Sequence, residues 1–106
     1  MRSILTFALT VAISLVAAPA FADRIDGNWC NPAGGNLHIE GDTIRIPSGR
    51  TLLGEYGHHS FRYVAPHGEN DEGAEITMIQ RSEEEMTLFR GSNPDGETWR
   101  RCSATS

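Results

Sequence analysis

From residue 25 onwards, apolar and polar side chains alternate in short segments that are separated by turn residues. In residues 36–40, Leu37 and Ile39 fall on one side of the chain, and His38 and Glu40 fall on the other. Alternation with a period of two is typical of a β-strand with one buried face. Most of the 11 glycines lie between the segments, where they mark turns. The pattern predicts an all-β domain.

We expect about eight short strands, and no segment shows a sustained helical period. The predicted strands are residues 25–30, 36–40, 43–46, 51–56, 59–64, 73–81, 86–90 and 97–102. The strand at 51–56 is the weakest because Gly54 interrupts it. In the strand at 59–64, His59, Phe61 and Tyr63 fall on one face.

The first 22 residues follow a different pattern. Arg2 precedes an apolar run over residues 4–18, and Pro19 and an Ala-Phe-Ala sequence follow it. This is the pattern of a secretory signal peptide that is cleaved after Ala22. The run is shorter than the ~20 residues that span a bilayer. We therefore expect a signal peptide over residues 1–22, a β-barrel domain over residues 23–106, no stable membrane anchor after cleavage, and a periplasmic or secreted location.

The chain has two cysteines, Cys30 and Cys102, near opposite ends of the predicted domain. In an exported protein such a pair is expected to be oxidised. We predict a structural disulfide that closes most of the domain into one loop and contributes roughly 4–5 kcal/mol to stability. The sequence contains no C-x-x-C motif, so a redox-catalytic role has little support.

The predicted disulfide also bears on the arrangement of the strands. Consecutive strands with short connections pair antiparallel, as a meander. An open sheet of this kind has two unpaired edges, which favour aggregation, and a disulfide between the first and last strands brings those edges together. The predicted fold is therefore a small antiparallel up-and-down barrel, closed or nearly closed. Its interior is just filled by side chains or holds one small ligand.

The charge of the predicted domain narrows the choice of partners. Without residues 1–22, eight arginines and 14 acidic residues remain, which gives a net charge of −6. An acidic surface argues against nucleic acid and anionic lipid as partners. It is compatible with a cationic protein partner, and the simpler interpretation is that the charge keeps the protein soluble.

Two short stretches resemble the signature of the calycin superfamily, the lipocalins and their small relatives. They are Gly27-x-Trp29 on the first predicted strand and Trp99-Arg100-Arg101 on the last. In that family, a first-strand tryptophan packs at the base of the barrel and an arginine of the last strand crosses its face. The resemblance implies that Trp29 is the base tryptophan and that Arg101 or Arg100 crosses it.

Because side chains alternate between the two faces of a strand, Arg101 is favoured over Arg100 as the arginine that crosses Trp29. If Cys30 and Cys102 point to one face, then Trp29, Trp99 and Arg101 point to the other. Two features depart from the family pattern: the domain has about half the usual lipocalin length, and Trp99 is not required. A deep ligand cup is therefore not expected.

In size and predicted location the protein is more similar to small periplasmic barrels that inhibit lysozymes or proteases, and to uncharacterised exported proteins of that build. Ser48 and Gly49 in a predicted turn, beside Arg50 and with Tyr56 downstream, are loosely similar to the protruding Ser/Gly/Tyr loop of lysozyme inhibitors. We take these four residues as candidate binding residues.

The histidines suggest a weak metal site as a further candidate. His67 and Glu69 lie in the long polar loop at residues 65–72, which a hairpin would bring over the strand that contains His59. These side chains are of the types that bind zinc, but their spacing matches no known ligand motif. A solvated polar loop is the simpler interpretation, so we predict no metal and no other cofactor. The chain has no G-x-S-x-G motif, and we predict no catalytic residues.

Three hypotheses follow for function. The first is a non-enzymatic interaction protein that inhibits a cationic hydrolase such as lysozyme or a protease, with residues 47–50 and 65–72 as its contact surface. The second is a carrier of a small apolar ligand, with an aromatic pocket, for which a filled barrel core is the simpler interpretation. The aromatic residues concerned are Trp29, Phe61, Tyr63 and Trp99. The third is a metal-binding module that uses His59 and His67.

Overall fold

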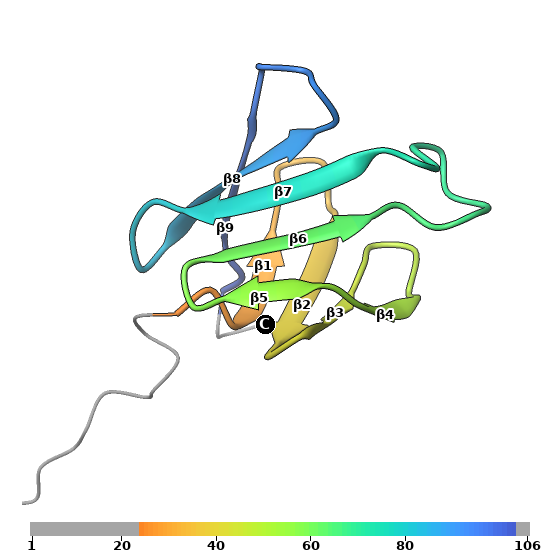
Figure 1. Ribbon diagram of the computed structural model, residues 1–106. Coiled ribbons are helices and arrows are strands. Elements are labelled where there is room, and N and C mark those ends of the chain that lie inside the picture. Colours follow the sequence, from red (N-terminus) through yellow and green to blue (C-terminus); the bar gives the residue numbers. More distant parts are fainter. Residues whose placement is uncertain (1–23, 104–106) are drawn as a thin grey trace, which may run out of the picture.

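Nine β-strands form one antiparallel sheet within residues 24–103, the part of the chain that the computed structural model describes (Figure 1). The strands are β1 (Gly27–Cys30), β2 (Asn36–Glu40), β3 (Thr43–Arg45), β4 (Thr51–Leu53), β5 (Glu55–Gly57), β6 (Ser60–Val64), β7 (Glu75–Gln80), β8 (Glu85–Arg90) and β9 (Glu97–Arg101). The predicted signal peptide and its cleavage site lie outside the described residues. No helix among residues 24–103 is long and apolar enough to cross a membrane.

The sheet curls into a nearly closed barrel, which confirms the predicted fold class. Its strand order is β4-β3-β2-β1-β9-β8-β7-β6-β5, so the first and last strands are neighbours. Trp29 of β1 lies opposite Arg101 of β9, and Cys30 lies opposite Arg100. Just beyond this pairing, a disulfide joins Cys30 to Cys102. The two outer strands, β4 and β5, are consecutive in the chain.

The predicted strand at 51–56 is two strands, and this is the main difference from the expected fold. Up to Leu53 the chain pairs with β3, and from Glu55 it pairs with β6. Gly54 lies at the change of partner, where its N–H donates to the Asp42 carbonyl over 2.9 Å. A Cβ on Gly54 would lie 2.4 Å from a carbon of the Phe61 ring. The chain can therefore pass from one side of the opening to the other only where a side chain is absent.

The barrel interior holds the side chains that the alternation places on one face. The buried apolar residues are Ile25, Trp29, Leu37, Ile39, Ile44, Ile46, Phe61, Tyr63, Ala65, Ile76, Met78, Met86, Leu88 and Trp99. On β6, Phe61 and Tyr63 point inward as predicted, but His59 precedes the strand and is exposed. Most of the interior is thus a packed core.

Residues 24–26 close one end of the barrel, which we call the base. The Ile25 N–H donates to the His58 carbonyl over 2.7 Å. The buried Asp26 carboxylate accepts hydrogen bonds from the Tyr56 hydroxyl and from the Gly41 N–H. Asp26 therefore ties β5 to the β2–β3 turn, across the gap that the sheet leaves open. Because residues 25 and 26 are committed to these contacts, β1 begins only at Gly27.

Candidate functional site

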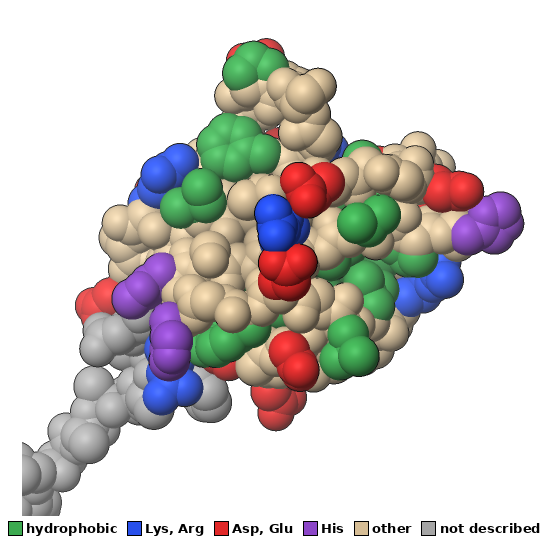
Figure 2. Space-filling view, in the orientation of Figure 1, with side chains coloured by type: hydrophobic (Ala, Val, Ile, Leu, Met, Phe, Trp, Pro, Cys, Tyr) green, Lys and Arg blue, Asp and Glu red, His purple; other side chains and the backbone are tan. Residues whose placement is uncertain are grey.

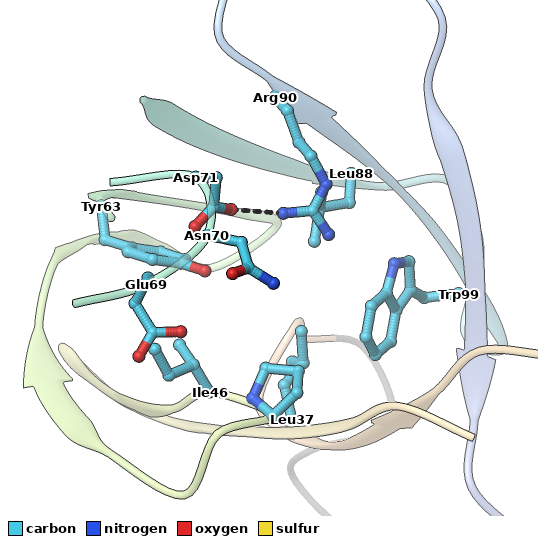
Figure 3. A pocket seen from close by; sticks show the side chains of 10 residues that line it. Leu37, Ile46, Tyr63, Glu69, Asn70, Asp71, Leu88, Arg90 and Trp99 are labelled. Carbon is cyan, nitrogen blue, oxygen red and sulfur yellow. Dashed lines mark hydrogen bonds and ion pairs between the residues drawn. The ribbon is translucent and has the colours of Figure 1, made fainter. Parts of the chain in front are cut away.

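A pocket of about 370 Å³ lies at the end of the barrel opposite the base, which we call the mouth (Figure 3). The β6–β7 loop, residues 65–74, arches over it, and β2, β8 and β9 supply its walls. The lining residues are Leu37, Ile46, Pro47, Tyr63, Glu69, Asn70, Asp71, Leu88, Arg90 and Trp99. The pocket combines residues from five separate segments, so it exists only when the barrel has formed.

The floor of the pocket is apolar. Leu37, Ile46, Leu88 and Trp99 are each at most 3% exposed. Leu37, Leu88 and Trp99 are inward residues of β2, β8 and β9, Ile46 directly follows β3, and all four line the pocket (Figure 3). Apolar surface at the bottom of a concavity favours burial of an apolar part of a ligand.

The rim is polar and is organised around Arg90. Its Nε and Nη2 atoms donate to the two carboxylate oxygens of Glu97 over 2.6 and 3.2 Å, and its Nη1 atom donates to Asp71 Oδ2 over 2.5 Å. The hydrogen bonds from Arg90 lower the pKa of Glu97. Arg90 thereby joins β8, β9 and the β6–β7 loop at the edge of the pocket.

Tyr63 brings a hydroxyl group to the pocket. Its side chain comes from the end of β6 and points into the pocket beside Asn70 (Figure 3). Tyr63 is 8% exposed, and no residue within 24–103 forms a hydrogen bond with its hydroxyl. Burial raises the pKa of Tyr63 to about 12. The hydroxyl is thus a neutral donor and acceptor with its capacity free for a ligand.

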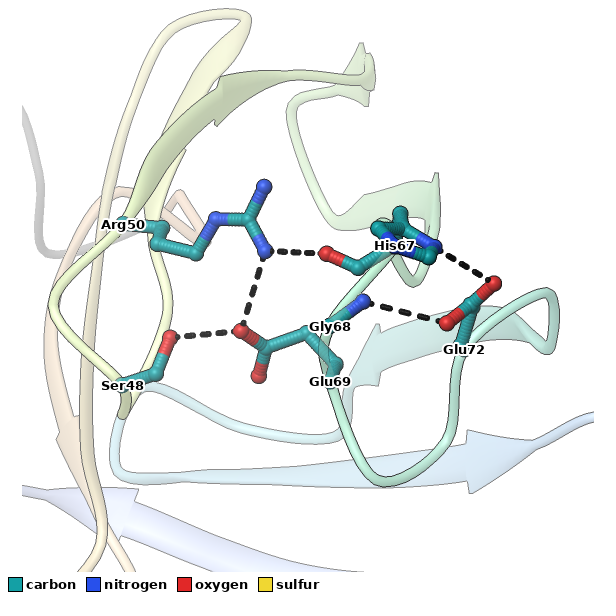
Figure 4. Close-up of polar contacts among 6 residues, drawn as sticks. All are labelled: Ser48, Arg50, His67, Gly68, Glu69 and Glu72. Atoms are coloured by element: carbon teal, nitrogen blue, oxygen red, sulfur yellow. Dashed lines mark hydrogen bonds and ion pairs between the residues drawn. The ribbon is translucent and has the colours of Figure 1, made fainter.

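The two loops predicted as a contact surface lie side by side at the mouth (Figure 4). Ser48 Oγ donates to Glu69 Oε2 over 2.9 Å. Arg50 Nη1 donates to the His67 carbonyl over 2.6 Å and lies 3.5 Å from Glu69 Oε2. The β3–β4 turn therefore holds the β6–β7 loop in place by polar contacts.

Glu72 supports the β6–β7 loop from within. Its carboxylate accepts a hydrogen bond from the Gly68 N–H over 3.1 Å and lies 3.0 Å from His67 Nδ1 (Figure 4). The Gly68 N–H, and after it the His67 ring, hold the pKa of Glu72 below its ordinary value. Ala65 and Ala74 anchor the two ends of this loop on the core, and the polar contacts of Glu69 and Glu72 hold the part between them over the pocket.

The structure separates the predicted candidates into two groups. Ser48, Gly49, Arg50, His67 and Glu69 gather at the mouth.

Tyr56 lies instead at the base, on Asp26, because β4 and Gly54 carry the chain away from the β3–β4 turn. The grouping of Tyr56 with Ser48 and Gly49, taken from the lysozyme inhibitors, is therefore wrong for this fold.

The structure also separates the two histidines proposed as metal ligands. His59 precedes β6 and His67 follows it, and the extended strand holds them at its opposite ends. Among residues 24–103, no group of three or more His, Cys, Asp or Glu side chains is arranged to hold a metal ion. The predicted return of the polar loop over the strand that contains His59 does not bring His59 and His67 together, because His59 lies before β6 and the loop lies at the mouth.

The four aromatic residues also divide between core and pocket. Trp29 and Phe61 lie wholly in the core, and Tyr63 and Trp99 also line the pocket. Of the rim residues, Asn70 and Asp71 lie within the predicted contact loop 65–72, whereas sequence reasoning did not select Arg90 and Glu97. A signal existed for Arg90, which continues the inward alternation of Met86 and Leu88 and so places a charge on the core face.

No protein-family model, curated protein or solved structure matches this chain. The contacts and shape of the mouth are therefore the basis for assigning a function.

Proposed function

We propose that this protein is an exported, non-enzymatic binding protein that takes up a small amphipathic ligand at the mouth of its barrel. The observation that carries the proposal is the pocket of about 370 Å³, with its apolar floor and its polar rim. Small-molecule sites are concavities of about this size, with a few polar groups that orient the ligand. The free hydroxyl of Tyr63 and the side-chain amide of Asn70 are such groups (Figure 3).

The calycin resemblance supports this proposal. The barrel is all-β and nearly closed, and Arg101 lies over Trp29 at the base, with its Cζ atom 4.1 Å from the ring centroid. The calycin resemblance implies a carrier of a small ligand. Export is supported by the signal-peptide pattern of residues 1–22 and by the disulfide between Cys30 and Cys102.

A neutral apolar fluorophore, N-phenyl-1-naphthylamine, tests the pocket directly. We expect it to bind at one site per chain. Asn70→Trp places a large side chain at the rim, on an exposed loop residue, and is expected to block binding without loss of the fold. Val64→Trp adds the same side chain at a position that is 59% exposed on the outer face of β6, and is expected to bind the fluorophore normally. Equal binding by both variants, or none by the natural protein, would contradict the proposal.

Native mass spectrometry of the protein recovered from its own envelope compartment tests export and the natural ligand together. We expect the mass of residues 23–106 less two hydrogens, with one small molecule bound. A recovered chain that retains residues 1–22 would contradict processing at Ala22.

Inhibition of a cationic hydrolase is a second candidate, and one observation favours it. The two predicted contact loops form one connected and exposed surface through the bonds of Ser48 and Arg50 to the β6–β7 loop (Figure 4). On the face shown in Figure 2, however, acidic side chains are interspersed with basic and apolar ones and form no continuous acidic area. The mouth pocket therefore has the stronger support.

Lysozyme is a suitable partner with which to test the second candidate. Binding is expected at low ionic strength and should weaken with added salt. Glu72→Gln at the mouth is expected to reduce binding more than Glu40→Gln at the base end of β2. An absence of binding at low ionic strength would count against inhibition and would leave the ligand proposal in place.

A further inference from the structure

The charges around the mouth pocket are unequal in number. Among its lining residues, Glu69 and Asp71 are acidic and Arg90 is basic. Glu97 lies against Arg90, and Arg50 lies 3.5 Å from Glu69. Three carboxylates thus face two guanidinium groups. An anionic ligand group would meet this negative excess, whereas a cationic one would be attracted by it.

The guanidinium of Arg90 is already committed to carboxylates. Nε and Nη2 donate to Glu97 and Nη1 donates to Asp71. An anionic head group would have to displace one of these charge-assisted bonds and leave a carboxylate without its partner. Arg50 is similarly engaged, because its closest contact is the His67 carbonyl, at 2.6 Å. The arginines of the mouth therefore do not form an anion site.

Two aromatic rings provide a second and independent feature that favours a cationic ligand. Tyr63 lies across the pocket from Trp99, which belongs to its apolar floor (Figure 3). The face of an aromatic ring attracts an ammonium group within about 6 Å of its centroid, and paired rings recognise quaternary ammonium ligands. The indole N–H of Trp99 donates to Glu97 over 3.3 Å, which fixes the ring in this position.

The Tyr63 hydroxyl adds a polar group that is itself directed at a ligand. Tyr63 is more than nine-tenths buried, at 8% exposure, and its hydroxyl has no partner among residues 24–103. A hydroxyl that meets no protein partner at the pocket can form a hydrogen bond with a ligand that enters it. Its oxygen can accept a hydrogen bond from an ammonium N–H.

We infer that the mouth pocket binds an organic cation, with an amine or quaternary ammonium head between Tyr63, Trp99 and the carboxylates of Glu69 and Asp71, and an aliphatic body on the floor. This inference rests on the proposed function, because it needs a ligand in the pocket. It goes further by naming the charge and chemistry of that ligand. It also excludes fatty acids and other anionic amphiphiles as preferred ligands, since their head group would face the same carboxylates.

Four amphiphiles with the same octyl chain test the inference: octyltrimethylammonium, octylammonium, octanol and octanoate. The two indole N–H signals in ¹H–¹⁵N NMR spectra report where they bind. Trp99 lines the pocket, and Trp29 lies at the base, where its N–H donates to the Ile25 carbonyl over 2.8 Å. We expect both cations to shift the Trp99 signal, to leave the Trp29 signal in place, and to bind about tenfold more tightly than octanol. Octanoate is expected to bind most weakly.

Two double variants with the same change in net charge distinguish attraction of the cation by the carboxylates of the mouth from attraction by the net charge of the whole protein. Glu69→Gln with Asp71→Asn removes the carboxylates of the mouth. Glu40→Gln with Asp42→Asn removes two carboxylates near the β2–β3 turn, at the base. We expect the mouth variant to lose about tenfold in affinity for octyltrimethylammonium and to keep its affinity for octanol. The base variant is expected to bind both ligands as the natural protein does.

Tyr63→Phe distinguishes the contribution of the hydroxyl to binding from that of the ring. We expect this variant to bind octylammonium more weakly, because that head group has N–H donors. Its affinity for octyltrimethylammonium should not change, because that head group has none. Loss of both ligands together, in a variant that remains folded, would overturn the role of the hydroxyl.

The outcomes distinguish this inference from the proposed function. Binding of all four amphiphiles with equal affinity, or a preference for octanoate, would overturn the cation inference and leave a ligand-binding pocket. Equal cation affinity in the two double variants would also overturn it. No shift of the Trp99 signal with any amphiphile would overturn the pocket itself, and the cation inference with it.

Discussion

Arg101 lies over the ring of Trp29, with 4.1 Å between its Cζ atom and the ring centroid. The same guanidinium donates hydrogen bonds to the backbone carbonyls of Arg24, Asp26 and Glu83. One side chain of the last strand thereby binds the first strand, the segment before it and the β7–β8 turn. Because these groups meet at the closed base, Arg101 stabilises the pairing on which the barrel depends.

Replacement of Arg101 by lysine is expected to destabilise the protein by about 2–3 kcal/mol. A lysine keeps the charge, but its three N–H groups share one nitrogen and cannot replace the donors that Arg101 spreads over Nε, Nη1 and Nη2, and it has no planar group to lie on the indole ring. Arg100→Lys is the matched control, because the Arg100 side chain is 67% exposed and its ion pair with Glu85 is on the surface. Urea denaturation measures both free energies of unfolding. Equal losses in the two variants would contradict the role of Arg101.

Removal of the disulfide is expected to lower the free energy of unfolding by about 4 kcal/mol. Cys30 and Cys102 are 72 residues apart in sequence, so their bond restricts most of the unfolded domain. The backbone pairing of β1 with β9 does not need the bond, and the double variant Cys30→Ala with Cys102→Ala should keep the fold under stabilising conditions. Urea denaturation with and without reductant checks the value. A loss below about 1 kcal/mol would indicate an unfolded state that is already compact.

Gly54→Ala is expected to cost about 2–3 kcal/mol, because the new methyl group would overlap the Phe61 ring and the Arg62 carbonyl. Gly49→Ala is the comparison: a Cβ there has open space, but its φ is +98°, which costs about 1–2 kcal/mol through the backbone alone. Thermal and urea unfolding of the two variants would separate the effects. A smaller loss at Gly54 than at Gly49 would show that the junction of β4 and β5 adjusts freely.

Stability at alkaline pH is expected to depend on Tyr63. The phenol of an unfolded chain ionises at about pH 10, whereas burial raises the pKa of Tyr63 to about 12. Between these values the folded protein keeps a proton that the unfolded protein has lost, so this contribution is complete below pH 10 and declines towards pH 12. Over that interval the natural protein should lose up to about 2–3 kcal/mol more than Tyr63→Phe. Parallel losses, measured by urea denaturation at both ends of the interval, would contradict the prediction.

Interpretation of the sequence was most successful where the information is local. The period of two in residues 36–40 predicted β2 with its observed bounds, with Leu37 and Ile39 inside. With only two cysteines in the chain, the predicted disulfide had a single possible pairing. The parity argument that favoured Arg101 over Arg100 refers to the side chain that lies over Trp29 in the structure. The first two inferences need only neighbouring residues or the count of a residue type. The arginine over Trp29 was expected from the calycin resemblance, and parity along the strand then chose Arg101.

Contacts between segments that are distant in sequence could not be predicted from the sequence. The loops at 47–50 and 65–72 were each selected because they are polar, but the alternation cannot show that Ser48 contacts Glu69. Tyr56 was assigned to the wrong end for the same reason: nothing near it in sequence indicates that Gly54 transfers the chain from β3 to β6.

The sequence by itself determined most of the strands and their buried faces, because alternation and turn residues act over a few positions. It also determined the disulfide, because the chain has only two cysteines, and the predicted barrel followed from that disulfide. Only the tertiary structure decided where the barrel opens and what surrounds its mouth. The pocket requires Arg90 to reach both Asp71 and Glu97, and such contacts form only after curvature and closure have brought β8, β9 and the β6–β7 loop together. Closure depends on the packing of the whole interior, and a period of two carries no information about it.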